Sequence, residues 1–181
     1  MTDSQPICLT DLVFAKVDEQ IERLEHILRQ LPVGKLDWAP DVPTSISPRP
    51  KSLGNLLGHL LECLAGFLAV LYAVHPDQLG HFQELKRRPV NHFCTESEAL
   101  DRIGEYRRYI AEGFERLQDS ELAHPLRTIF VPEGEPVLTL LLGNLEHLVN
   151  HKHEVFVYAK LLGVPLITPD LYHFRRPRMD R

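Results

Sequence analysis

Two histidines in the last third of the chain, His147 and His151, stand four positions apart in a stretch without proline. In a helix, a turn of about 100° and a rise of ~1.5 Å per residue place both imidazoles on one face, roughly 6 Å apart along the axis. Two imidazoles so placed can bind one metal ion together with a ligand from another element. Pairs with this spacing also occur on solvated helix faces, so a role without metal stays open.

His59 is the best candidate for the third ligand, because it lies among Leu56, Leu57, Leu60 and Leu61. A buried imidazole must find partners for its ring nitrogens or lose its hydration energy. A metal shared with the other two histidines would supply a partner, and a hydrogen bond within the core is the alternative.

Two acidic or soft side chains lie near these histidines on the expected helices. Glu154 follows His151 by three positions and could accept a hydrogen bond from a ligand histidine, act as a base or form a surface salt bridge. Cys63 follows His59 by four positions and could be a fourth ligand, which would close the site and make it structural. Packing in the core is the alternative for Cys63.

Two familiar metal-binding motifs do not match this sequence. The zinc-peptidase motif has Glu directly after its first histidine, where this chain has Leu148. A ferritin-like di-iron bundle needs Glu-x-x-His on two helices, and the single string of this kind, Glu121–His124, directly precedes Pro125 in an expected loop. A mononuclear site therefore remains.

Helical periodicity predicts four long helices to position these residues. The first is expected over residues 9–31, and the second over 53–74, with Ser52 as its N-cap. The third should begin at a capping box, Thr95–Glu98, and end near 119, and the fourth should begin at about 135–139 and end at Gly163. The proline-rich segment 35–51 should be a loop with Trp38 as its packing anchor or as a pocket wall. Residues 75–94 should be irregular, with His75, His81 and His92 solvated, and a short hairpin is expected over 125–137.

These elements predict an all-α protein, a four-helix bundle with long loops. We expect one domain over 1–181, with a core over about 9–163 and a C-terminal extension over 164–181. The leucine-rich faces of the first and last helices favour a homodimer.

Composition limits the classes of function. The chain has 181 residues, 44% hydrophobic and 25% charged, with a net charge of −5, which does not favour a nucleic-acid partner. Its three scattered cysteines indicate a reducing compartment. The N-terminus does not read as a secretory signal, and His59, Glu62 and glycines interrupt the apolar stretch 56–74. We expect a soluble, cytoplasmic protein without a membrane span.

Several segments together resemble the DinB-like (DinB/YfiT) superfamily. Leu36-Asp-Trp-Ala-Pro40 followed by Ser52–Leu60 is similar to the Trp-x-Pro loop and the helix with a histidine in its second turn. Pro136–Thr139, Glu146–Val155 and Tyr158–Gly163 are similar to the last-helix signature, in which the second ligand histidine precedes the closing glycine by twelve residues. The resemblance spans most of the chain up to Gly163.

This resemblance implies a four-helix bundle in which His59, His147 and His151 bind one divalent metal. The family often reads His-Arg-Gly-Gln from its second ligand, whereas this chain reads His151-Lys152-His153-Glu154. Lys152 keeps the positive charge, and His153 should face solvent or a partner. Family members include hydrolase-like proteins and transferases that use bacillithiol, mycothiol or glutathione.

Ligation by nitrogen favours Zn, Ni or Fe over Mg or Ca, which prefer oxygen. Our hypothesis is a metal-dependent hydrolase or a low-molecular-weight-thiol S-transferase acting on a small molecule. The alternatives are a non-catalytic metal-binding stress or interaction protein with a structural metal, and a metal-free bundle.

Overall fold

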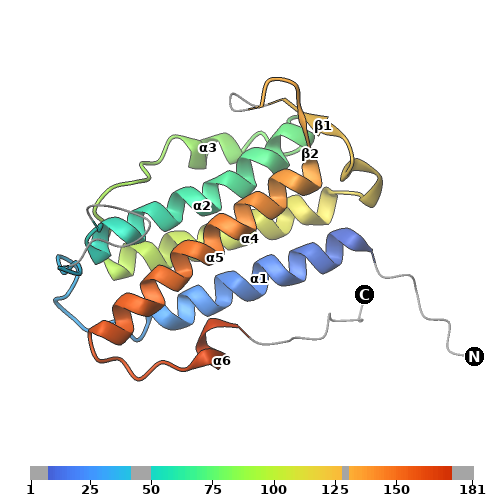
Figure 1. Ribbon diagram of the computed structural model, residues 1–181. Coiled ribbons are helices and arrows are strands. Elements are labelled where there is room, and N and C mark those ends of the chain that lie inside the picture. Colours follow the sequence, from blue (N-terminus) through green and yellow to red (C-terminus); the bar gives the residue numbers. More distant parts are fainter. Residues whose placement is uncertain (1–7, 42–49, 128–130, 173–181) are drawn as a thin grey trace, which may run out of the picture.

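Four long helices form the bundle in the computed structural model, which describes residues 8–41, 50–127 and 131–172 (Figure 1). They are α1 (Leu9–Leu28), α2 (Leu53–Val74), α4 (Glu96–Arg116) and α5 (Val137–Leu161). Both α1 and α2 pack against α4 and against α5. The all-α four-helix fold expected from the sequence is confirmed, and α2 and α5, which carry the three histidines, are neighbours.

Local sequence explains where two of the four long helices begin. Ser52 accepts a hydrogen bond from the Asn55 amide at the start of α2, and Thr95 accepts one from the Glu98 amide at the start of α4. The expected capping box is only half formed, because the Glu98 carboxylate contacts His92 at 2.8 Å. The first helix begins differently: Cys8 provides no side-chain cap, and Asp119 accepts hydrogen bonds from the amides of Leu9 and Thr10.

Helix α2 forms the centre of the core. Among the described helices it alone has the length and composition to cross a membrane, with a hydropathy of 1.8 over an 18-residue window. Within the bundle, 56% of that window is buried. Burial of this kind is what the core helix of a soluble protein shows.

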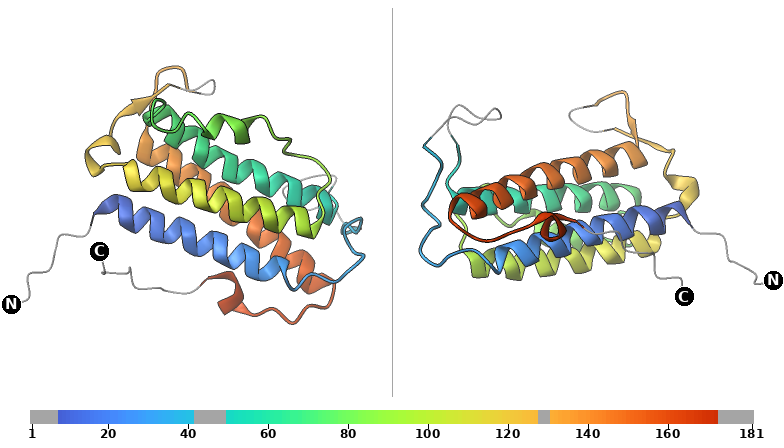
Figure 2. Two further views of the ribbon diagram at one scale, coloured as in Figure 1. Left: turned by 180° about the vertical axis from the view of Figure 1, so that it is seen from behind. Right: turned by 60° about the horizontal axis from the view of Figure 1, so that its bottom comes forward.

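Shorter elements connect and cover the bundle. They are α3 (Phe82–Lys86), the 3₁₀ helix η1 (Asp119–Glu121), the strands β1 (Pro125–Leu126) and β2 (Glu135–Pro136), and α6 (Thr168–Leu171). The strands pair antiparallel, so the expected short hairpin is present, although residues 128–130 lie outside the described part. Figure 2 shows α6 beside α1, so the start of the expected C-terminal extension packs on the bundle. Residues 173–181 of that extension lie outside the described part.

The segment 75–94 is more ordered than the sequence indicates, because it contains α3 and its histidines pair with glutamates. His75 lies 3.1 Å from Glu121, His81 lies 2.9 Å from Glu112, and His92 pairs with Glu98 as described above. His75 and His92 are half-buried, which corrects the expectation that they are solvated.

Two loops close over the N-terminal end of α2. The Trp38 carbonyl accepts from the Leu53 amide at 2.8 Å, and the Trp38 ring packs edge-on against Tyr158 of α5 at 5.4 Å. This is the geometry of a packing anchor. From the other side, residues 91–94 run along α2, where the Asn91 and Cys94 amides donate to the carbonyls of Gly58 and Gly54, each at 3.0 Å.

Candidate metal centre

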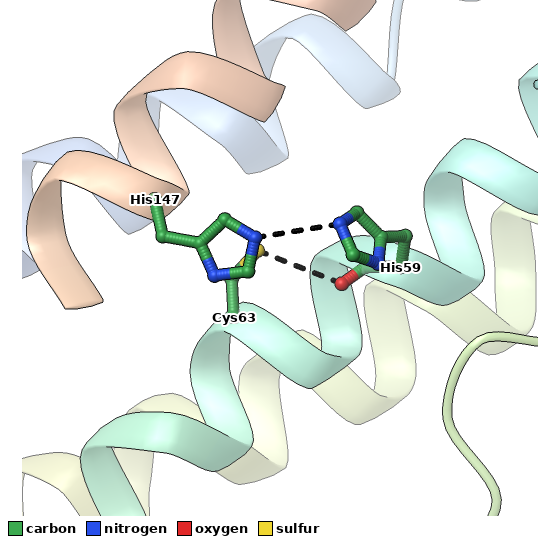
Figure 3. A group of neighbouring side chains, drawn as sticks. All are labelled: His59, Cys63 and His147. Carbon is green, nitrogen blue, oxygen red and sulfur yellow. Dashed lines mark hydrogen bonds between the residues drawn. The ribbon is translucent and has the colours of Figure 1, made fainter. Parts of the chain in front are cut away.

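The three predicted histidines converge between α2 and α5. The Nε2 atom of His59 lies 3.0 Å from Nε2 of His151 and 3.4 Å from Nε2 of His147. Figure 3 shows His59 and His147 pointing toward one another from the two helices, with Cys63 of α2 behind the His147 ring in this view. The helical spacing of His147 and His151 therefore does place both rings toward one residue of α2.

These spacings suit a bound metal ion. Tetrahedral zinc with Zn–N bonds of about 2.0–2.1 Å holds its nitrogens about 3.3–3.4 Å apart, and octahedral ligation at similar bond lengths holds adjacent nitrogens about 3.0 Å apart. The two Nε2 separations from His59 fall near these values. The donor set is also the one that Zn, Ni and Fe prefer. The residues present therefore fit the metal that the resemblance implies.

Hydrogen bonds on the far side of His151 define which of its nitrogens is free. Its Nδ1 lies 3.0 Å from Oε2 of Glu154, and an ionised carboxylate can only accept, so Nδ1 carries the proton. The pKa of Glu154 is lowered, mainly by this hydrogen bond. The other oxygen, Oε1, accepts from the Tyr158 hydroxyl at 3.2 Å. Nε2 of His151 is thus left with its lone pair toward His59.

His59 has acceptors of its own. Its Nδ1 lies 2.5 Å from Oδ1 of Asn91 and 3.0 Å from Oε2 of Glu62. Glu62 is one helical turn away, as the sequence spacing indicates. Asn91 is not detectable from the sequence, because it lies 32 positions away on a loop and no motif links it to His59.

Burial favours the neutral, metal-binding form of His59 and His147. Desolvation is the largest cause that lowers the pKa of His59 and of His147 from 6.5. The positive charge of Lys51 lowers both values further. Both rings are therefore uncharged and able to donate a lone pair at neutral pH.

Cys63 forms a group of possible metal donors with His59 and His147. One ligand atom from each of His59, Cys63 and His147 can be chosen so that all lie within 4.8 Å of one another. The Cys63 thiol is fully buried and contacts the His59 carbonyl at 3.5 Å, and burial raises its pKa to about 12. It is therefore a neutral thiol here, and it would bind a metal only after losing its proton.

A second group of donors, His92, Cys94 and Glu98, also lies within 4.8 Å of one another. In this group Glu98 is already bonded to His92, and the Arg102 guanidinium lies 3.9 Å from the same carboxylate oxygen. A neighbouring positive charge opposes the binding of a cation. These residues are better described as an ion-pair network at the start of α4.

The described surface also has a hollow of about 310 Å³ between α1, α5 and the segment around Leu171. Lys152 lies at this hollow with 2% of its surface exposed, and it donates to the Gln20 side chain and to the Leu171 carbonyl. None of the three predicted histidines, His59, His147 and His151, lines it. The hollow and the candidate metal centre are therefore separate features.

Comparison with known proteins gives a family and a fold. A family model described as the DinB superfamily matches residues 16–155. A search of curated proteins finds no match. Among solved structures, a DinB-like protein from Bacillus subtilis (YjoA) is similar, with a TM-score of 0.60 and 16% identity over 86% of this chain and 96% of that one. At this identity the likeness shows the fold alone.

Proposed function

Because this chain belongs to the DinB superfamily, we propose that His59, His147 and His151 bind one divalent transition metal for chemistry on a small molecule. The reaction is hydrolysis or the transfer of a low-molecular-weight thiol, in the cytoplasm, where such thiols are kept reduced. The convergence of three Nε2 atoms at 3.0 and 3.4 Å is the observation that carries the proposal.

A metal bound there would lower the pKa of a coordinated water or thiol and polarise a substrate oxygen. The protein residues hold the protons that determine which nitrogens are free. Glu154 keeps a proton on Nδ1 of His151, and both of its oxygens are occupied, by His151 and by Tyr158. This arrangement supports an orienting role for Glu154 over that of a free general base.

A structural metal is the second candidate function. It is favoured by Cys63, which is fully buried beside His59 and His147 and could complete a closed, four-coordinate site. A catalytic site would instead keep a position open for water or substrate. Replacing Cys63 with Ser distinguishes the two: a structural zinc should be lost or weakened strongly, whereas a three-histidine catalytic site should keep its metal.

The proposal is tested by elemental analysis of protein purified without a chelating tag, at a pH above 7. We expect about one Zn, Ni or Fe per wild-type chain and less than a tenth of that in His147→Ala, since two ligands hold a metal weakly. The matched control is His153→Ala, which removes an exposed histidine from the same helix. A wild-type chain that binds no transition metal would contradict the ligand assignment.

Activity and stability separate the candidate functions once a metal is found. Hydrolysis of model esters and amides, and thiol addition to an electrophile, would be measured for the metal-loaded wild type and for His147→Ala. For a functional site we expect metal-dependent turnover and a nearly unchanged melting temperature in the variant. Collapse of the fold in His147→Ala, with no turnover by the wild type, would favour a structural metal.

A further inference from the structure

Asn91 contacts the metal centre from outside the two helices that build it. Its side-chain oxygen lies 2.5 Å from Nδ1 of His59, on the side of the ring opposite to Nε2. A neutral imidazole carries one proton, so an acceptor at Nδ1 leaves Nε2 with its lone pair.

The backbone of the loop brings Asn91 to this position. Asn91 has a φ of +58°, a left-handed conformation that Asn adopts more readily than most residues. Its amide donates to the Gly58 carbonyl at 3.0 Å, one residue before His59. A Cβ atom at Gly58 would lie 1.8 Å from the His92 carbonyl oxygen, so only glycine lets the loop come this close.

We propose that Asn91 is a positioning residue that holds His59 with its proton on Nδ1 and turns the Nε2 lone pair toward His147 and His151. This inference rests on the proposed function, because Nε2 is the atom that would bind the metal. His151 has the same arrangement with Glu154 as its acceptor. The histidines of both helices are thus oriented by an acceptor at Nδ1. For His151 of α5 this acceptor is a carboxylate of the same helix, and for His59 of α2 it is the side-chain amide of a loop residue.

Glu62 is the competing acceptor for the same proton. Its Oε2 lies 3.0 Å from Nδ1 of His59, its side chain is 44% exposed to water, and Asn91 is exposed as well. Asn91 is closer, at 2.5 Å, and its loop is held to α2 by the amide hydrogen bonds of Asn91 and Cys94. Asn91 should therefore dominate, and the variants must be made with and without Glu62.

Two substitutions separate the side chain from the backbone. Asn91→Gly removes the acceptor but keeps the left-handed φ without strain. Asn91→Asp returns an oxygen acceptor at the same place and should restore the Nδ1–H form of His59 that Asn91→Gly loses. Each would be combined with Glu62→Ala, and circular dichroism would verify that every variant keeps its helices.

The direct measurement is the tautomer of His59 in metal-free protein near neutral pH. Two-bond ¹⁵N–¹H correlation spectra of histidine-labelled protein report it, and His59→Gln identifies the signal. We expect the Nδ1–H form in the wild type and a mixture of both tautomers in Asn91→Gly. The Nε2–H fraction of this mixture should be larger when Glu62 is also replaced. Asn91→Asp should recover the Nδ1–H form. Zn²⁺ affinity should fall about 10–100-fold in Asn91→Gly, the usual effect of losing an outer partner of a ligand.

The inference is overturned if wild-type His59 carries its proton on Nε2, or if Asn91→Gly leaves the tautomer unchanged in both backgrounds. The proposed function fails separately. A chain that binds no Zn²⁺ but shows the Asn91-dependent tautomer would contradict the metal site and support the positioning role. A chain that binds Zn²⁺ with a tautomer independent of Asn91 would support the metal site and contradict the positioning role.

Discussion

His151 and Glu154 show how the orientation of an imidazole is set by the contact of its second nitrogen. The imidazole of His151 would be free to turn if its Nδ1 faced water, but the Glu154 carboxylate holds that nitrogen at 3.0 Å. Tyr158 in turn fixes the carboxylate from one helical turn further along. The three residues lie on one face of α5, so the helix itself supplies the orientation.

Replacing Glu154 with Ala should weaken Zn²⁺ binding by about 10–100-fold, because His151 would lose the acceptor that fixes its tautomer. Glu154→Gln keeps an acceptor and should lose less, and Tyr158→Phe should lose least. Isothermal titration calorimetry of Zn²⁺ into metal-free protein measures the effect.

The matched control is Glu146→Ala, an exposed glutamate on the same helix. Should Glu154→Ala retain wild-type Zn²⁺ affinity and lose only turnover, Glu154 would act as a base and the orienting role would be wrong.

At the scale of elements, α1 depends on a residue far away in the chain for its N-terminal cap. Cys8 offers no side-chain hydrogen bond, while Asp119 of η1 accepts from the Leu9 amide at 2.8 Å and from the Thr10 amide at 2.9 Å. These bonds lower the pKa of Asp119 from 3.8, with the Thr10 amide as the largest cause. A carboxylate at a helix N-terminus also interacts favourably with the helix dipole.

Asp119→Ala should lower the melting temperature by about 2–4 °C at neutral pH, since two amides of α1 lose their partner. Because the folded pKa lies below 3.8, this stabilisation is present above pH 3.8 and is lost as the pH falls through the folded value. The difference between wild type and variant should therefore be constant from pH 7 to 5 and shrink below about 3.8.

Differential scanning calorimetry across this pH range makes the measurement, with Asp77→Ala, an exposed aspartate in the turn after α2, as the control. An equal loss in both variants, or a difference that does not change with pH, would show that the cap contributes nothing specific.

At the scale of the whole molecule, one side of α5 leaves apolar side chains exposed. Leu142, Val149, Val157 and Leu161 are between 36% and 61% exposed and follow one another at spacings of seven, eight and four. Exposed apolar side chains on one side of a helix favour association, and a two-fold axis would pair them with their copies. We therefore propose a homodimer whose contact includes these four side chains.

Val149→Glu should convert the dimer to a monomer, because it would place two carboxylates in an apolar contact. Sedimentation velocity at micromolar concentration measures the change. The matched control is Val33→Glu, which adds the same charge at a valine that is 95% exposed in the turn after α1. A monomeric wild type, or a dimer that survives Val149→Glu, would contradict this contact.

The sequence by itself determined the main helices and the candidate histidines that they carry. Helix α2 has the bounds that Ser52 and Pro76 predict, and the bundle follows from four apolar periodicities. The spacing of His147 and His151 and the apolar setting of His59 correctly predict rings that meet. These features depend on neighbours within one or two turns, and such short-range preferences are written into a single stretch of chain.

Tertiary structure decided the partners. Asn91 reaches His59 across 32 positions and Asp119 caps a helix more than 100 positions earlier. Lys152, expected only to keep a charge, is buried between α1 and α6, and burial lowers its pKa to about 8. Such contacts join residues with no periodic relation, so they exist only once the helices have packed and the loops have closed over them.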